Sequence, residues 1–323
     1  MNEIEHTYLD FVENRHGIWV SRYLGEDAPW ADDPILVANK FTNVFRILDY
    51  GSQFLAVDLL EPALDERDTL MRAFLYRHTG KVASWKFFEL MNGRYPICQD
   101  LVDGTLLETL KQYRGGGERK DRNSLNKKYN PREGATFQSF DRSVFTSAYL
   151  VFPQSQVRGT DKLESIVDLA RRLFMTKDDI VPKFLKAKSQ RDKFQVLHDN
   201  KGVGDFMSMQ ILTDWGYSQF GEDLENDFIV AGPGAVKGSA AIFPKMKAGA
   251  VIKWAHEQVQ QLSVYITLPN SVIRRPTLMD VQNTLCEFSK YVRFMGKPLS
   301  NKSYSPAHPG KQSPPYLPEH WQH

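Results

Sequence analysis

Apolar residues recur three or four positions apart along much of the chain, which is the period of an amphipathic helix. Over 35–49 this pattern predicts a helix, with Gly51 as the stop signal behind it. Residues 63–78 are rich in the helix formers Leu, Arg and Ala. The strongest apolar stripe runs over 161–174, behind Thr160 as a candidate N-cap. These stretches favour a helical fold.

Capping chemistry marks another helix near Pro276. Thr277 and Asp280 have the spacing of a capping box, and apolar residues line one face of the sequence that follows. Strand patterns are few and weak, namely AYLVF at 148–152 and SVYIT at 263–267. No repeat of about 20–50 residues is visible, which argues against a solenoid. We therefore predict a mainly α fold with few short strands.

The composition is that of a globular chain. The 323 residues, 41% hydrophobic and 25% charged, suffice for one large domain or two modest ones. No apolar run reaches the ~18 residues of a membrane span, and the first ten residues lack the apolar core of a signal peptide. Cys98 and Cys286 lie too far apart for a zinc knuckle or a disulfide framework. We expect a cytoplasmic protein with reduced thiols and no membrane contact.

Several catalytic motifs are absent from the sequence. The Gly-Lys pairs lack the upstream glycine or the following hydroxyl of a phosphate-binding loop, which argues against a nucleotide-dependent kinase. His256 and Glu257 lack the second histidine of a zinc-protease helix, and no G-x-S-x-G elbow occurs. We therefore expect neither a protein-held metal nor a cofactor.

A basic loop and a proline-rich tail interrupt the compact pattern. The loop, 112–139, holds seven basic residues against three acids between 114 and 133, whereas the whole chain has a net charge of only +2. It is either a solvated insertion or an arm that tracks DNA phosphates. The second interpretation makes DNA contacts of Lys120, Arg122, Lys127 and Lys128. The tail, 296–323, cannot continue a helix and either wraps the surface or stays loose.

A glycine turn between two short helices is the most informative local pattern. One helix is expected to end near Leu197, and a second to run from about Asp205 to Trp215. The turn between them is Lys201-Gly202-Val203-Gly204, whose glycines allow a close backbone approach by a ligand. The amides at the start of the second helix suit a DNA phosphate. The pattern resembles the helix-hairpin-helix element of DNA glycosylases, although an ordinary helical hairpin is the alternative.

That resemblance implies a catalytic residue. Helix-hairpin-helix glycosylases carry an aspartate roughly twenty residues beyond the hairpin, at the start of a helix that faces the flipped base, and Asp227 stands at this offset. Such a carboxylate stabilises the developing sugar cation or activates water. Alternatively, Asp227 merely ends the acidic run at 222–225. Bifunctional members carry a lysine two positions after the second glycine; here the residue is Phe206, so we expect a monofunctional enzyme.

Four segments narrow the resemblance to one family. They are 40–55, 203–218, 226–238 and 276–297, with the strings DFIVAGPGA and LCEFSKY among them. They resemble the α-glutamyl/putrescinyl-thymine pyrophosphorylase-like family, also described as the helical domain associated with 5-hydroxymethyluracil DNA kinases. The resemblance implies a helix-hairpin-helix glycosylase-like fold.

On this interpretation residues 1–295 form a single two-lobed helical domain with the hairpin at 190–215. Some relatives resemble transferases that join an amino acid or a polyamine to an activated 5-hydroxymethyluracil in phage DNA. Others resemble glycosylases of phage defence that excise bulky bases such as glucosylated hydroxymethylcytosine.

The family segments contain candidates for a base pocket. Asn43, Arg46, Asp49 and Gln53 lie three or four positions apart, so they would share one helix face that either meets solvent or lines a pocket. The resemblance favours the pocket. Further candidates, with structural roles as the alternative, are Gln210 and Glu287 in the base pocket and Lys237 as a DNA contact.

Three functions remain open on the sequence alone. The first is a monofunctional glycosylase that flips a hypermodified pyrimidine out of double-stranded phage DNA and excises it with Asp227. The second is a transferase in which an amine displaces pyrophosphate from a modified thymine in DNA. The third is a DNA-binding module without catalysis. The offset of Asp227 favours excision.

Overall fold

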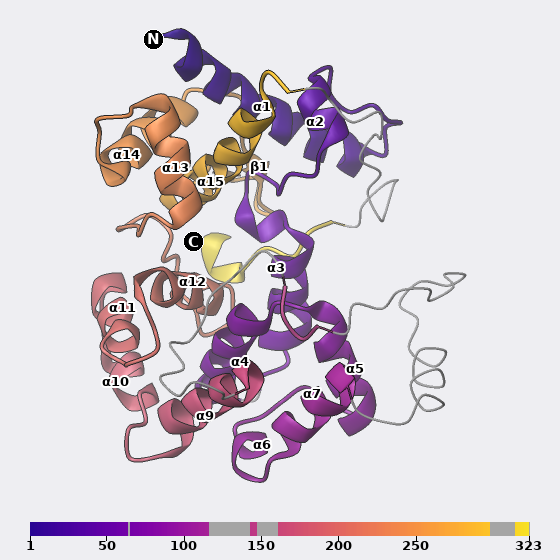
Figure 1. Ribbon diagram of the computed structural model, residues 1–323, viewed down its shortest axis with the longest axis vertical. Helices are drawn as coiled ribbons and strands as arrows, with labels where there is room; N and C mark the ends of the chain where they lie inside the picture. The colour runs from indigo at the N-terminus through magenta and orange to yellow at the C-terminus, as the bar shows by residue number, and fades with distance from the viewer. Residues whose placement is uncertain (64, 116–142, 147–160, 298–313, 323) are drawn as a thin grey trace. The chain divides into compact units, whose positions relative to one another are not determined.

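The structure, a computed structural model, describes residues 1–63, 65–115, 143–146, 161–297 and 314–322. The chain divides into two compact units (Figure 1). Unit 1 comprises 1–53 and 221–323, and unit 2 comprises 54–220. In the described ranges helices dominate, and the one sheet has two short strands, so the mainly α prediction is confirmed.

Unit 1 is built around its last long helix, α15 (Leu278–Phe294). It packs against α13 (Pro233–Ile242), α14 (Ala248–Val259) and α1 (Glu3–Leu24). Figure 1 shows α13 and α14 in orange beside α15. Aromatic rings fill the space between α1 and α15, with Tyr8 in edge contact with Phe288 and Phe11 4.8 Å from Tyr291 between ring centroids.

Two glycines let α13 approach α15 unusually closely. A Cβ atom on Gly238 would lie 1.9 Å from the Leu285 carbonyl oxygen, and one on Gly234 would lie 2.1 Å from Cys286 Sγ. At Gly238 a side chain would collide with the backbone of α15, whereas at Gly234 the Cys286 side chain would have to turn away. The sequence VAGPGAVKG (230–238), which lies in one of the four segments that carry the resemblance, therefore also serves to pack α13 against α15.

The predicted capping box at the start of α15 is confirmed. The Thr277 hydroxyl accepts the Asp280 N–H, and the Asp280 carboxylate accepts the Thr277 N–H in return. Asp280 also accepts the backbone N–H of Arg46 at 2.7 Å, which anchors the short helix η1 (Arg46–Leu48) to α15. Burial and the nearby Glu225 carboxylate raise the pKa of Asp280.

The prediction of one helix over 35–49 is wrong. The chain forms α2 (Pro34–Ala38), an irregular segment, η1 and then α3 (Tyr50–Phe54). In the irregular segment, 39–45, the carbonyls of Thr42 and Asn43 accept hydrogen bonds from the Arg15 side chain of α1 instead of from helical N–H groups. Its apolar residues Val44 and Phe45 are buried nevertheless, and this produced the misleading pattern.

The structure also shortens one predicted strand and replaces one predicted N-cap, Thr160, by its neighbour. The strand expected at 263–267 shortens to β1 (Ile266–Thr267), which pairs antiparallel with β2 (Ile273–Arg274). The strand expected at 148–152 lies outside the described residues. The N-cap of the helix expected at 161–174 is Asp161, which accepts from the N–H groups of Leu163 and Glu164.

Unit 2 is arranged around α4 (Glu66–Thr79), whose residues 68–79 are all buried. It contacts α9 (Lys162–Met175), α12 (Asp205–Trp215) and the π-helical η2 (Leu55–Leu60). Arg77 of α4 and Asp214 of α12 form a buried bidentate ion pair with both bonds at 2.6 Å. In the described part of unit 2 the further helices are α5 (Val82–Asn92), α6 (Gln99–Val102), α7 (Thr105–Gly115), α10 (Val181–Lys186) and α11 (Gln190–His198).

The last described segment, 314–322, belongs to unit 1 and ends in a short helix, η3 (Glu319–Gln322). The Gln53 side chain donates to the Tyr316 carbonyl at 3.0 Å and accepts its N–H at 2.8 Å. The guanidinium of Arg274 lies 3.5 Å from the ring centroid of Trp321. This part of the proline-rich tail is therefore held by specific contacts.

Replacing Gly238 by alanine should destabilise the protein by about 2 kcal/mol or more, because the new methyl group pushes α13 away from α15. Urea denaturation measures the loss. Gly249→Ala is the matched control, since Gly249 lies in α14 with no atom within 4 Å of its would-be Cβ. Equal stability of the two variants would contradict the close approach.

Candidate functional site

A pocket of about 420 Å³ opens in unit 1 between α1, α2 and the irregular segment 39–45. Its size falls within the ~300–1,000 Å³ usual for small-molecule sites. Its lining comes from α1, from the connection to α2 and from 39–45, and consists of Arg15, Ile18, Arg22, Ala28, Pro29, Trp30, Ala31, Leu36, Val37, Asn39, Phe41, Thr42 and Asn43. The lining thus combines aromatic rings with amides and guanidinium groups.

Arg15 of α1 is one of the residues that line the pocket. It is only 3% exposed, and its Nη2 donates to the carbonyls of Thr42 and Asn43, both at 2.7 Å. Its Nε also donates to the Thr42 carbonyl, whereas its Nη1 has no hydrogen-bond partner among the described residues. Burial lowers the pKa of this guanidinium, and the carboxylates of Glu287 and Asp49 oppose that effect.

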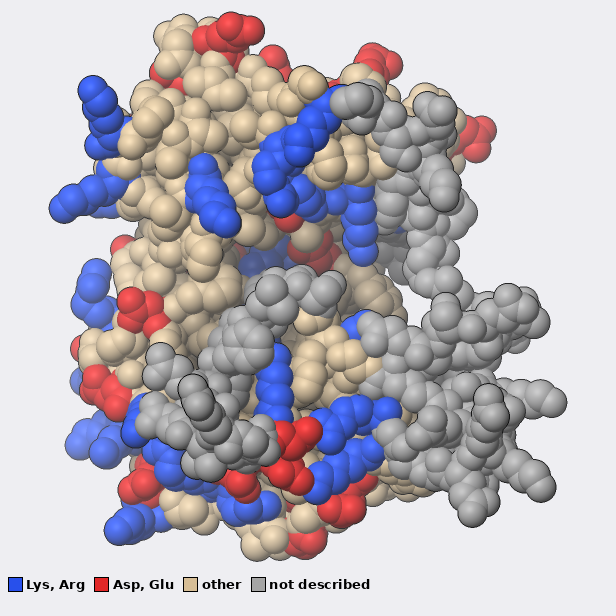
Figure 2. All heavy atoms as spheres, viewed as in Figure 1, with Lys and Arg blue, Asp and Glu red and all other residues tan. Residues whose placement is uncertain are grey.

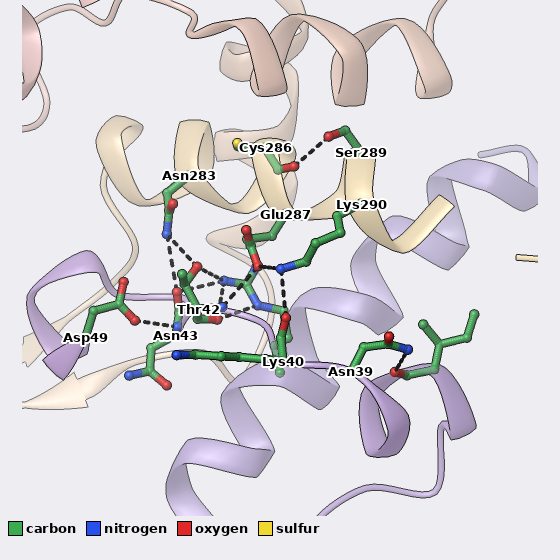
Figure 3. A network of polar contacts seen from close by, with 12 residues as sticks. Asn39, Lys40, Thr42, Asn43, Asp49, Asn283, Cys286, Glu287, Ser289 and Lys290 are labelled. Atoms are coloured by element: carbon green, nitrogen blue, oxygen red, sulfur yellow. Dashed lines mark hydrogen bonds and ion pairs between the residues drawn. The ribbon is translucent and has the colours of Figure 1, made fainter. Parts of the chain in front are cut away.

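The opposite side of the irregular segment is held by α15 (Figure 3). Glu287 accepts the Thr42 N–H at 3.0 Å and the Lys290 ammonium at 2.7 Å. Lys290 also donates to the Lys40 carbonyl at 2.7 Å, and Asn283 reaches the Thr42 hydroxyl. Segment 39–45 is therefore fixed by side chains from α1 and α15 rather than by its own backbone hydrogen bonds.

Asp49 closes this network at the start of α3. Its Oδ1 accepts the Asn43 N–H at 2.8 Å, and its side chain is partly buried. Burial raises the pKa of Asp49 to about 7, while the Asn43 N–H and the Arg15 charge act in the opposite direction. A carboxyl group with a pKa near neutrality beside a pocket can hold or release a proton at physiological pH.

Two aromatic residues, Trp30 and Phe41, line the pocket. The Arg22 guanidinium lies 5.4 Å from the Trp30 ring centroid, and the indole N–H donates to the Glu26 carbonyl at 2.8 Å. Phe41 lies under the Lys290 ammonium and packs edge-on against Phe11. Such rings offer stacking surfaces for a planar heterocycle.

The structure brings together three of the six predicted base-pocket residues. Asn43 lines the pocket, and Asp49 and Glu287 bind the segment that carries it. Asn43 and Asp49 do not share a helix face with Arg46 and Gln53 as predicted, because the chain is not helical between α2 and η1.

The other three base-pocket candidates have different surroundings. Arg46 is buried, and its N–H binds Asp280. Gln53 is engaged by the backbone of the tail. Gln210 belongs to unit 2, where it is buried in α12. Their role in base recognition stays a prediction.

Asp227 lies in an exposed bend of unit 1, ahead of α13, which begins at Pro233. Its carboxylate makes no hydrogen bond or ion pair with any residue the structure describes. The residues just before it are fixed, because Glu225 pairs with Arg274 at 2.9 Å and Asn226 accepts the Leu278 N–H. Asp227 is thus an available carboxylate on an anchored segment.

The predicted glycine hairpin is confirmed as a structural element of unit 2. α11 and α12 flank the turn, and Gly202 has φ +101°, a conformation that L side chains rarely adopt. Gly204 is the N-cap of α12 and has no side-chain cap. Lys201 is exposed, and at the start of α12 Asp205 pairs with His198 at 2.6 Å. Because the N-cap residue is a glycine, no side chain caps the N-terminal N–H groups of α12.

The remaining DNA-contact candidates are placed only in part. Lys237 is exposed on α13. The basic loop with Lys120, Arg122, Lys127 and Lys128 lies outside the described residues. On the face drawn in Figure 2, the Lys and Arg side chains of the described residues are interspersed with Asp and Glu.

Sequence reasoning missed Arg15, which lines the pocket and holds Thr42 and Asn43. The buried positions of α1 include Tyr8, Phe11, Val12 and Trp19, and Arg15 continues their helical spacing. A basic residue on the apolar face of a helix was therefore the available signal. Within the described ranges, no group of three His, Cys, Asp or Glu side chains could hold a metal, and no helix is long and apolar enough to cross a membrane.

Fold and site define a mainly helical protein with a glycine hairpin in one unit and a polar, aromatic pocket in the other. The chain belongs to the family described as 5-hmdU DNA kinase, helical domain, whose sequence profile matches residues 2–120 and 126–301. No curated protein and no solved structure matches the chain. The family connects this protein with the processing of modified pyrimidines in DNA.

The titration of Asp49 predicts a pH-dependent stability. Its pKa is about 7 in the fold and near 4 in an unfolded chain, so the folded state binds more protons across that window. Its contribution is therefore favourable at low pH and is lost as the pH rises from about 4 to 7. From pH 5 to pH 8 the wild type should therefore lose stability relative to Asp49→Asn, by on the order of 2 kcal/mol in the free energy of unfolding. Urea denaturation at both pH values measures this.

The control for that experiment is Asp10→Asn, which changes an exposed carboxylate of α1. Its stability curve should run parallel to that of the wild type. If Asp49→Asn also runs parallel, the carboxyl group does not titrate near pH 7.

Proposed function

We propose that this protein is a monofunctional DNA glycosylase that flips a bulky modified pyrimidine out of the duplex and hydrolyses its N-glycosidic bond. The observation that carries the proposal is the polar, aromatic pocket of unit 1, in a chain whose family is connected with modified pyrimidines in DNA. An enzyme that acts on a base must take it out of the stack into such a pocket.

The hydrogen-bonding groups of the pocket suit a pyrimidine. The Asn39 and Asn43 side-chain amides donate to the carbonyls of Ile35 and Leu48, which fixes both side chains. Within the described part of the chain neither Oδ1 accepts a hydrogen bond, so both are acceptors for a ligand. The N3–H of a uracil ring or the amino group of a cytosine ring would meet such an acceptor, while Trp30 and Phe41 offer stacking surfaces.

Asp227 is the proposed catalytic carboxylate. Its exposure and its lack of partners among the described residues leave both oxygens available to a nucleotide. In this role it stabilises the positive charge that develops on the sugar and orients the attacking water. No lysine stands at the hairpin position where bifunctional relatives carry one, since Phe206 occupies it. The product would then be an intact strand with an abasic site.

The glycine hairpin is the proposed grip on the DNA backbone. The amides at the start of α12 and the neighbouring Lys201 together form an anion-binding end of the kind that holds phosphates. Contacts of this type fix the position of the protein on DNA without reading its sequence.

Incubation with DNA that carries known pyrimidine modifications tests the proposal. Mass spectrometry should find the free modified base, and alkali should cleave the strand at the resulting abasic site. A gain in mass of the base upon addition of an amine to pyrophosphorylated DNA, with every glycosidic bond intact, would replace excision by transfer. Binding without either product would leave only a DNA-binding module.

Asp227→Asn should lower the rate of base release by about a thousandfold or more, because it removes the charge without changing the shape. Single-turnover kinetics on modified DNA measures the rate, and anisotropy should report nearly unchanged DNA affinity. Glu257→Gln, an exposed carboxylate of α14, serves as the matched control and should retain full activity. Wild-type rates in Asp227→Asn would remove this residue from the mechanism.

Gly204→Ala should weaken DNA binding several-fold, about 1 kcal/mol, because the added methyl group stands where a phosphate meets the amides of α12. The structure has room for this methyl group, so the variant should stay folded, with a loss of stability of at most about 1 kcal/mol from the exchange of glycine for alanine at an N-cap. Fluorescence anisotropy with two unrelated duplexes should show equal losses. Unchanged affinity for both duplexes would mean that the hairpin is only a structural turn.

A further inference from the structure

The acidic segment just before Asp227 is tied to a single guanidinium group. Arg274 of β2 donates to both carboxylate oxygens of Asp223, at 2.7 and 3.1 Å, and to Glu225 at 2.9 Å. The side chains of Glu225 and Arg274 are only 4% and 9% exposed. Two acidic residues that precede Asp227 therefore share one buried cation.

The first residues of α15 hold the same segment through their backbone. The Leu278 N–H donates to the Asn226 side chain at 3.2 Å. The Met279 N–H donates to the Glu225 carbonyl at 3.3 Å. The chain is thereby fixed up to the residue before Asp227, and adjacent Cα atoms lie only about 3.8 Å apart. A shift of this segment would therefore be passed on to the Asp227 carboxylate.

An aromatic ring from the segment 314–322 covers this guanidinium group. The Arg274 guanidinium lies 3.5 Å from the ring centroid of Trp321, which is itself 8% exposed. A cation over an indole face is favourable, and a ring that keeps water away strengthens the ion pairs beside it. Trp321 lies beyond the residues that the family profile matches, which end at 301. The contact therefore joins a residue outside the family match to the segment that precedes Asp227.

Stability alone does not account for so many charges in this place. Glu225 and Asp280 are both buried, and burial together with the Glu225 charge raises the pKa of Asp280. Buried ion pairs are often no more stabilising than apolar side chains of similar volume, and what they provide is one defined geometry. The neighbouring group that needs a defined geometry is Asp227, whose carboxylate has no partner among the described residues.

We propose that Arg274 and Trp321 are positioning residues that hold the segment 223–227 in one conformation, so that the Asp227 carboxylate meets the sugar of the flipped nucleotide. The inference rests on the proposed function in one respect, namely that Asp227 is the catalytic carboxylate. Without the ring or the guanidinium, Asp227 would visit conformations away from the reacting bond, and small displacements of this kind lower rates strongly.

Hydrogen exchange tests whether the segment is held, and it needs no substrate. The amides of Leu278 and Met279 report on the segment, because their acceptors belong to Asn226 and Glu225. In Trp321→Ala both amides should exchange about tenfold faster, since the segment leaves them more often. The amides of α14 should exchange as in the wild type. Unchanged exchange at Leu278 and Met279 would overturn the inference.

Single-turnover base release tests whether the held conformation matters for catalysis. Trp321→Ala should release the base about tenfold more slowly, while its dissociation constant for modified DNA stays within about twofold of the wild-type value. Trp321→Phe keeps an aromatic ring over the guanidinium and should restore most of the rate. Arg274→Lys keeps the charge but loses the planar fork, so it should also be slower by about tenfold.

Ile166→Val is the control for a loss of stability alone. It removes a buried methyl group of α9 in unit 2 and should lower the thermal midpoint of unfolding by a few degrees, with base release at the wild-type rate below that midpoint. A wild-type rate in Trp321→Ala, or a rate that falls only in step with DNA affinity, would overturn the inference. A wild type that releases no base would instead contradict the proposed function, and the exchange experiment would still decide whether the segment 223–227 is held.

Discussion

The buried guanidinium of Arg15 is the interaction on which the pocket of unit 1 depends. It holds the carbonyls of Thr42 and Asn43, and so replaces the hydrogen bonds that a helix would have given this part of the chain. Since segment 39–45 is not helical, its amide and aromatic side chains can line a pocket instead of a helix surface. The same guanidinium is left with one nitrogen that has no partner among the described residues.

The packing behind the pocket supports this arrangement. α15 presents Glu287 and Lys290 to the irregular segment on one side and receives α13 on the other, where Gly238 permits close contact. Because α15 starts at a capping box that also binds the Arg46 N–H, the position of η1 is tied to the same helix. Asp49, just beyond η1, therefore meets Asn43 in a fixed geometry.

Much of the fold could be predicted from local sequence patterns. Helix periodicity located α9, the glycine turn located α12 and the capping box located α15, because each of these signals lies within a few neighbouring residues. The irregular path of 39–45 could not be predicted in this way. It depends on a side chain 27 positions earlier in the chain, and no local pattern encodes such a bond.

The candidate site was predicted only in part for the same reason. Asn43, Asp49 and Glu287 were named from family strings and spacing, and they do lie in one network. The reason given for grouping Asn43 with Asp49, a shared helix face, was wrong. Arg15 was missed because it stands among the buried apolar positions of α1, where an ordinary helix would carry another apolar residue. Its role depends on contacts that only the tertiary structure provides.

The central claim is that the modified pyrimidine enters the pocket beside Arg15. A crystal structure with duplex DNA that carries a 2′-fluoro analogue of the modified nucleotide, which resists cleavage, tests it most directly. The account predicts the extrahelical base between Trp30 and Phe41, with its edge at Asn39 or Asn43. A flipped base outside this pocket, or a target base that stays stacked in the duplex, would contradict the account.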